Sequence, residues 1–189
     1  MGLEFFRVSH DFAEYEKLEG IIKRQFPPEE YMSLERLLVL QDKGDVEIWA
    51  LYSSKELIGF TTLRTQSDMA YLFFLAFDDR YQGKGYGKEA VRKIGSLYSD
   101  RAVTVDFELV DENAVNNQQR IRRRNFYRKC GFAETGWGLE YLGVRYEIFC
   151  LNQSFQIKSF KSMLNKLPIK DFCPKYFKLS NDKTQKITD

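Results

Sequence analysis

Residues 69–87 read MAYLFFLAFDDRYQGKGYG, the most apolar run of the chain followed by a loop with three glycines. Met69–Phe77 is apolar at both sets of alternating positions, as expected of a strand covered by helices on its two faces. Ala90 to Tyr98 then carry apolar side chains at helical spacing. We therefore predict a buried central strand that turns through a glycine loop into a helix.

The three glycines of this loop are Gly83, Gly85 and Gly87. Glycine at a strand-to-helix corner lets successive backbone N–H groups point outward with no Cβ in the way. The unpaired amides and the dipole of the helix add to this, so a diphosphate is the expected ligand. The loop matches neither the P-loop pattern GxxxxGK[ST] nor GxGxxG in a first βαβ unit. A glycine-rich turn without a ligand is the alternative.

The rest of the chain predicts an α/β (α+β) fold with one site. A length of 189 residues suits one well-buried domain. We expect that domain at residues 1–153, with a lysine-rich helical extension at 154–189. Periodicity and turn residues predict strands at 5–8, 46–52, 56–64, 69–77, 102–110, around 134–138 and at 144–151. They predict helices at 12–26, from 29 to Gly44, at 90–98, before a C-cap at Gly131, and at 157–167 before Pro168.

Composition excludes several classes of protein. With 29 basic and 27 acidic residues, the net charge of +2 gives little attraction to nucleic acid or an anionic membrane. The longest apolar run is too short to span a bilayer. The three cysteines, Cys130, Cys150 and Cys173, form no CxxC motif and no ligand cluster with His10. We expect reduced thiols, no metal and a cytoplasmic location.

A second motif, FYRKCGF, occupies Phe126–Phe132 at the end of a basic helix. Together with the glycine loop it resembles the GNAT superfamily of acyl-CoA-dependent N-acetyltransferases. The first family motif, [Q/R]-x-x-G-x-[G/A] between a strand and a helix, is filled by Gln82, Gly85 and Gly87. The later motif, aromatic-Tyr-x-x-x-Gly-Phe, is filled by Tyr127, Gly131 and Phe132.

The resemblance implies a mixed, mostly antiparallel central sheet of about six or seven strands flanked by helices. It implies acetyl-CoA as cosubstrate, with the pantetheine arm pairing along the central strand at Leu75 and Phe77. A backbone N–H there would stabilise the oxyanion formed when an amine attacks the thioester, without a metal. The residues expected to hold the pyrophosphate are Gln82, Gly83, Lys84, Gly85, Tyr86, Gly87 and Lys88.

Tyr127 is the expected catalytic acid. A thiolate with a pKa of about 8.5 can take a proton from a tyrosine with a pKa of about 10 held within hydrogen-bond reach. The alternative is a packing role beside Phe126 and Phe132. The carboxylate candidate for the base is Glu108, which projects from the polar face of its predicted strand. A surface role for Glu108 and a water chain acting as base are the alternatives.

The basic helix departs from the family at Arg120 and Arg123, where relatives commonly carry Asn and Ala. Residues 120, 123, 124 and 127 share a helical face. Our hypothesis is that Arg120 and Arg124 contact phosphates of coenzyme A. A solvated charged face is the alternative, and nucleic-acid binding comes third.

The acceptor should be a primary amine of a small molecule or peptide. The family places it between the turns at Phe26–Tyr31 and Trp137–Gly143. Acidic residues in these turns would suit a cationic amine, although helix starts and exposed turns explain them equally well. The sequence is also compatible with a homodimer. The competing functions are a non-catalytic module that binds acyl-CoA and a basic-helix protein that binds RNA.

Overall fold

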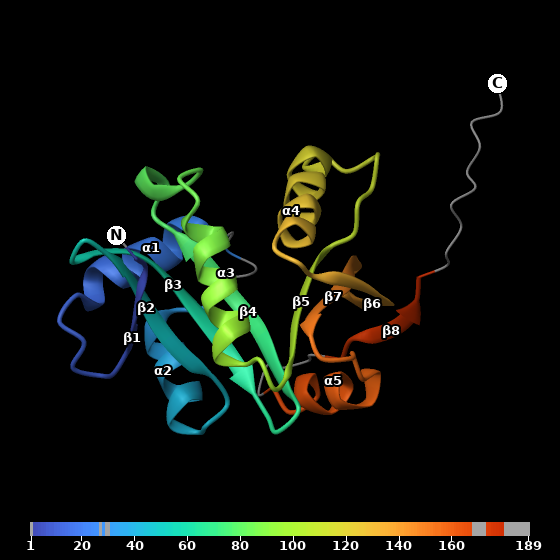
Figure 1. The fold of residues 1–189 in the computed structure, drawn as a ribbon, viewed down its shortest axis with the longest axis horizontal. Helices are drawn as coiled ribbons and strands as arrows, with labels where there is room; N and C mark the ends of the chain where they lie inside the picture. Colours follow the sequence, from blue (N-terminus) through green and yellow to red (C-terminus); the bar gives the residue numbers. More distant parts are fainter. Residues whose placement is uncertain (1, 27, 29–30, 168–172, 180–189) are drawn as a thin grey trace. The chain divides into compact units, whose positions relative to one another are not determined.

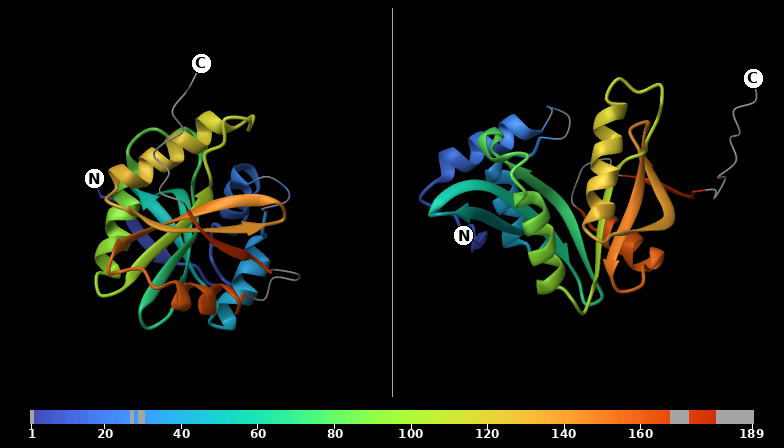
Figure 2. Two further views of the ribbon diagram at one scale, coloured as in Figure 1. Left: turned by 90° about the vertical axis from the view of Figure 1, so that its right-hand side faces the viewer. Right: turned by 45° about the horizontal axis from the view of Figure 1, so that its top comes forward.

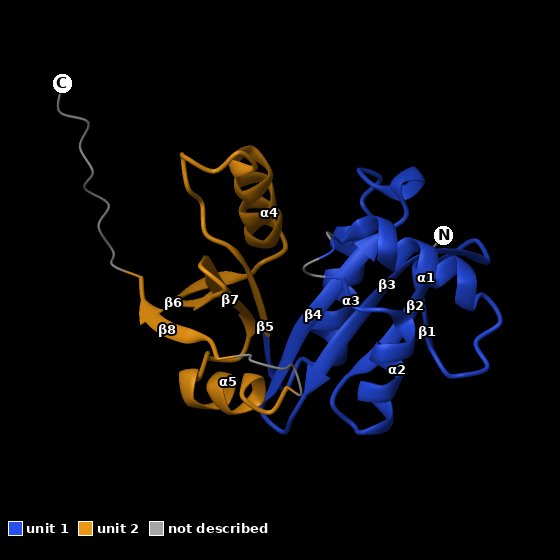
Figure 3. Ribbon diagram, turned by 180° about the vertical axis from the view of Figure 1, so that it is seen from behind, with its two compact units in different colours: residues 1–103 blue, residues 104–189 orange. Residues whose placement is uncertain are grey.

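The computed structural model describes residues 2–26, 28, 31–167 and 173–179. The chain divides into two compact units, residues 1–103 and 104–189, which Figure 3 colours separately. The boundary predicted from sequence, between residues 153 and 154, stays a prediction. Each unit contains both strands and helices (Figure 1).

Unit 1 is built on four antiparallel strands that lie in chain order. These strands are β1 (Glu4–Arg7), β2 (Glu47–Ser53), β3 (Glu56–Thr65) and β4 (Met69–Phe77). All four agree in position with the strands expected from sequence. The long apolar run is therefore a strand, as its two apolar faces predicted.

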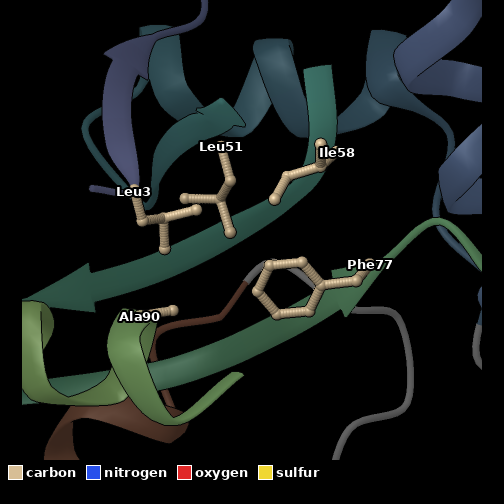
Figure 4. Close-up of a cluster of buried hydrophobic side chains, with 5 residues drawn as sticks. All are labelled: Leu3, Leu51, Ile58, Phe77 and Ala90. Carbon is tan, nitrogen blue, oxygen red and sulfur yellow. The ribbon is translucent and has the colours of Figure 1, made fainter. Parts of the chain in front are cut away.

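Helices cover both faces of this sheet (Figure 2). They are α1 (Tyr15–Gln25) and α2 (Leu34–Asp42) on one face and α3 (Tyr86–Leu97) on the other. The face under α3 holds a buried cluster of Leu3, Leu51, Ile58, Phe77 and Ala90 (Figure 4). Burying branched and aromatic side chains of this size contributes roughly 1.5–3 kcal/mol each. The helix that carries the glycine loop is thus fixed to β4 through Ala90 and Phe77.

The start of α2 differs from the sequence prediction. The acidic start expected at residues 29–30 lies outside the described residues. The helix itself begins at Leu34, and the Ser33 hydroxyl accepts a hydrogen bond from the Arg36 N–H at 3.3 Å. A serine cap satisfies a first-turn amide directly, which is the commonest way to begin a helix.

β4 carries a bulge at its centre. Thr62 of β3 pairs with Phe74 and Leu63 pairs with Leu72, so Phe73 has no partner on β3. A bulge of this kind bends its strand and redirects the neighbouring side chains.

Unit 2 has the strand order β5-β7-β6-β8. Its elements are β5 (Ala102–Glu108), α4 (Asn117–Lys129), β6 (Ala133–Tyr141), β7 (Val144–Asn152), α5 (Ile157–Leu164) and β8 (Lys175–Lys178). The strand β8 was not predicted, and it pairs antiparallel with β6. The extension expected at residues 154–189 therefore contributes a strand to the sheet of unit 2.

The predicted fold class is confirmed. The described residues contain five α-helices and eight strands, slightly more strands than the six or seven expected. The β1–β2, β2–β3, β3–β4, β6–β7 and β6–β8 pairs are antiparallel. Across the same part of the chain, every helix is too short or too polar to cross a lipid bilayer.

Candidate active site

The glycine loop has the backbone conformation that its sequence predicted. Gly83 and Gly85 have φ of +72° and +89°, and an added Cβ at either would meet no atom within 4 Å. Gly85 caps α3, whose first residue is Tyr86. Within the described residues, the N–H groups from Gly83 to Lys88 have no backbone acceptor, and the N–H of Glu89 is the first to donate into the helix, to Gly85 at 3.2 Å. Such a row of open amides attracts an anion.

Gln82 anchors the loop rather than extending from it. Its amide nitrogen donates to Gln25 Oε1 at 2.8 Å, to Asp79 Oδ1 at 3.0 Å and to the Phe77 carbonyl at 3.3 Å. These bonds tie the start of the loop to α1 and to the end of β4. The glutamine of the family motif thus holds the loop in place.

Asp78 is a residue of this site that the sequence analysis missed. It is 7% exposed, and its carboxylate accepts from the backbone N–H and Nε of Arg80 at 3.1 and 2.9 Å and from Arg24 Nη2 at 3.1 Å. The hydrogen bond from the Arg80 side chain, above all, lowers the pKa of Asp78. Asp directly after a strand and before a short turn is a capping signal that could have identified it.

Of the other loop residues, Tyr86 packs against the protein, whereas the lysines are exposed. The Tyr86 ring stacks on Phe77 with centroids 6.3 Å apart, and its hydroxyl accepts from Ser53 at 3.2 Å. Lys84 places its ammonium 5.3 Å from the centroid of the Tyr81 ring. Lys84 and Lys88 are both exposed. Two cationic side chains beside open amides strengthen the attraction for a diphosphate.

The backbone of β4 offers hydrogen-bonding groups at Leu75 and Phe77. The Asp78 N–H donates to the Ile58 carbonyl at 2.8 Å, so these two residues form a hydrogen-bonded pair of the antiparallel ladder. Such pairs alternate with non-hydrogen-bonded pairs along two strands. Phe77 and Leu75, opposite Gly59 and Thr61, belong to the second kind. Their N–H and C=O groups therefore point away from β3, as pairing with a pantetheine arm would require.

Tyr127 lies in unit 2, within an aromatic cluster. Its side chain is 8% exposed and stacks on Phe107 at 5.3 Å, with Phe126 and Phe132 packed edge-on. Burial raises the pKa of Tyr127, so the phenol stays protonated at neutral and moderately alkaline pH. The packing role weighed from sequence is observed. A protonated phenol also suits a proton donor, and that role stays a prediction.

Glu108 is held by cationic side chains of α4. Arg120 Nη2 lies 2.9 Å and Arg123 Nη1 3.5 Å from its carboxylate, and the Asn116 amide donates to both of its oxygens. Arg120 also donates to the Leu109 carbonyl at 2.9 Å. The arginine that departs from the family pattern thus has a structural partner in the preceding strand.

Arg124 forms a second ion-pair group in unit 2. Its Nε lies 2.8 Å from Glu147 Oε1 and its Nη2 lies 2.7 Å from Glu134 Oε1, while Arg128 also contacts Glu134. The Glu147 side chain is 2% exposed. Burial raises its pKa more than the contact with Arg124 lowers it. The proposed phosphate contacts of Arg120 and Arg124 stay predictions, and both guanidinium groups have carboxylate partners.

Comparison with known proteins agrees with this geometry. A family model described as Acetyltransferase (GNAT) family matches residues 15–132. No curated protein matched the sequence. The chain belongs to the GNAT acetyltransferase family, which confirms the resemblance stated from its two motifs.

Several solved structures have a similar fold over most of the chain. A GNAT-family protein from Bacteroides thetaiotaomicron is 21% identical with a TM-score of 0.64, covering 87% of this chain and 95% of its own. A Bacillus subtilis acetyltransferase in complex with CoA is 15% identical with a TM-score of 0.53, covering 80% and 98%. A spermidine N-acetyltransferase chimera of Vibrio cholerae SpeG and hSSAT is 17% identical with a TM-score of 0.57, covering 82% and 98%.

Proposed function

We propose that this protein transfers an acetyl group from acetyl-CoA to a primary amine of a small molecule or peptide, by direct attack of the amine on the thioester. The observation that carries this proposal is the run of open amides from Gly83 to Lys88 at the start of α3, beside a central strand whose Leu75 and Phe77 backbone groups point away from β3. The first feature suits a pyrophosphate and the second suits an amide-containing arm.

The chemistry needs a neutral amine, a stabilised oxyanion and a protonated leaving group. The amine nitrogen forms a bond to the carbonyl carbon, the C–S bond breaks, and the electron pair leaves with sulfur. A β4 backbone N–H at Leu75 or Phe77 would stabilise the oxyanion, and Tyr127 would give its proton to the thiolate. The proton lost by the amine goes to Glu108 or through water to solvent.

Arg120 and Arg124 are proposed to contact the phosphates of the coenzyme. Their ion pairs with Glu108, Glu134 and Glu147 favour a second role, which is to fix α4 to its own sheet. Replacing both arginines by alanine and measuring acetyl-CoA affinity at several salt concentrations separates the roles. A phosphate contact predicts weaker binding with a smaller salt dependence, and unchanged binding would withdraw this part of the proposal.

The amine acceptor, the cellular location and the oligomeric state of the protein are also proposals. The solved neighbour named for spermidine N-acetylation suggests a small amine as the acceptor. The thiols of Cys130, Cys150 and Cys173 suit a reducing cytoplasm. A homodimer remains compatible with the sequence. The RNA-binding alternative loses support, because four arginines of α4 have carboxylate partners.

The test is an assay of free thiol released from acetyl-CoA across a library of primary amines. Amine-dependent thiol release with an acetylated product is the expected result. Thermal stabilisation by acetyl-CoA without thiol release would instead favour the non-catalytic acyl-CoA module. The absence of both effects would refute the proposed function.

A further inference from the structure

The middle of β4 is more exposed than its ends. Phe73, Phe74 and Leu75 are half-buried, whereas the four residues before them and the two after them are buried. A strand that is apolar on both faces is normally covered along its whole length. Two large aromatic side chains at its centre therefore keep part of their surface exposed.

These side chains belong to a group of four phenylalanines that we name the aromatic wall: Phe26, Phe60, Phe73 and Phe74. The Phe26 and Phe74 rings meet edge-to-face with centroids 4.7 Å apart, and the Phe73 and Phe74 rings lie 4.3 Å apart. Phe60 is fully buried and supports Phe26 at 6.1 Å and Phe74 at 6.5 Å. The bulge at Phe73 explains why consecutive rings of one strand lie side by side. Phe26, like Phe74, is half-buried.

The aromatic wall adjoins the proposed reaction centre. Phe74 precedes Leu75, whose backbone groups point away from β3 and are proposed to meet the thioester. The Leu75 side chain packs in the cluster under α3, whereas the Phe74 ring meets Phe26 at the end of α1. An amine that approaches the thioester from the α1 face therefore passes these rings.

Two carboxylates of this face, among the residues that the structure describes, are already engaged. Glu19 accepts hydrogen bonds from the Tyr31 hydroxyl and, at 2.6 Å, from the Leu34 N–H. Asp78 is paired with Arg24 and Arg80. The distant ammonium groups of a polyamine need carboxylates as partners, whereas an apolar substituent gains by contact with aromatic rings.

We infer that the acceptor is a primary amine with an apolar, preferably aromatic, substituent, and that the aromatic wall binds this substituent. The inference rests on the proposed function and narrows its substrate class. It predicts that an apolar group on the amine improves an acceptor more than further ammonium groups do. A free arylalkylamine and a peptide with an aromatic first residue share this chemistry.

Matched acceptors test the inference with the full-length protein and acetyl-CoA. Thiol release is measured with 2-phenylethylamine, ethylamine, spermidine and a phenylalanyl dipeptide amide. We expect kcat/KM for 2-phenylethylamine or the dipeptide to exceed that for ethylamine by about tenfold or more, as loss of a ring from an apolar pocket implies. The better of the two aromatic acceptors identifies the source of the amine.

Variants of the aromatic wall link this preference to its residues. Phe26→Leu and Phe74→Leu should each reduce the preference for 2-phenylethylamine over ethylamine about fivefold while leaving KM for acetyl-CoA unchanged. Phe6→Leu is the control, since Phe6 is a 49% exposed aromatic on β1. Two leucine variants keep the test informative if one fails to fold.

Each outcome has a distinct meaning. An equal or higher kcat/KM for spermidine or ethylamine would overturn the inference and leave the acetyltransferase proposal standing. An aromatic preference that survives both leucine variants would also overturn it. Acetyl-CoA binding without thiol release from any acceptor would refute the proposed function itself.

Discussion

Replacing Gly85 by alanine tests the anion site at its most constrained position. An L-residue held at the left-handed φ of +89° costs roughly 1–2 kcal/mol, and nothing within 4 Å of the new Cβ adds a steric clash. Residues 82–85 are exposed, so the free loop can relax to relieve the strain. The loop cannot relax in this way while acetyl-CoA is bound. The free-energy cost of the left-handed alanine therefore weakens the binding of acetyl-CoA. We expect acetyl-CoA affinity to fall by about five- to thirtyfold, at tenfold per 1.4 kcal/mol.

Gly44→Ala is the matched control for this prediction. Gly44 follows α2 with φ of +74°, and its added Cβ would also meet no atom within 4 Å. The backbone cost is therefore similar, but the residue is remote from the glycine loop in the chain. Calorimetric titration with acetyl-CoA should show a loss for Gly85→Ala and none for Gly44→Ala. Unchanged affinity of Gly85→Ala, or equal losses in both variants, would refute the open-amide account of the site.

Four further predictions concern unit 2. Tyr127→Phe should lower kcat by about 10²-fold or more with a smaller change in KM for acetyl-CoA, and steady-state kinetics showing an unchanged kcat would contradict its role as the acid. Arg124→Ala leaves the carboxylate of Glu147 buried and unpaired, so urea denaturation should show a loss of about 3–5 kcal/mol that Glu147→Gln partly restores. Because burial raises the pKa of Glu147, its stabilising contribution is present at acidic pH and is lost as pH rises through that pKa, so the stability of the parent relative to Glu147→Gln should fall from pH 4 toward neutrality. Burial raises the pKa of the Cys150 thiol to about 11, so iodoacetamide at pH 8 should label the exposed Cys173 and leave Cys150 unmodified until the protein unfolds, as peptide mapping would reveal.

Local signals predicted most elements of the fold because their apolar periodicity matches their burial. Val91 and Ile94 are buried along α3, and every apolar residue of Met69–Leu72 is buried in β4. The strand β8 escaped prediction because Lys175–Lys178, KYFK, is four residues long with charged ends. Its pairing with β6 depends on residues distant in the chain, which a local pattern does not contain.

The part of the candidate site that depends on backbone conformation could be predicted from the sequence. A glycine requirement is local, so the left-handed conformations at Gly83 and Gly85 follow from the sequence. Contacts between distant side chains are not local. The placement of Gln25 beside Gln82, and of Arg24 beside Asp78, depends on how α1 packs against the end of β4. No spacing rule within one segment could have identified these pairs.

The basic helix shows why a run of charges is a weak guide to a ligand. Arg120 and Arg123 share Glu108, whereas Arg124 and Arg128 share Glu134. The sequence counts these arginines as a cationic patch, but in unit 2 each lies against a carboxylate from another element. These four arginines share Glu108, Glu134 and Glu147, so their charge is partly balanced before any ligand binds. The amides of the glycine loop have no such partner in the described part of the chain, and their partial charges cannot be removed by titration. The run of arginines therefore does not identify a ligand site by itself, whereas open amides at the start of a helix attract an anion whatever the side chains around them.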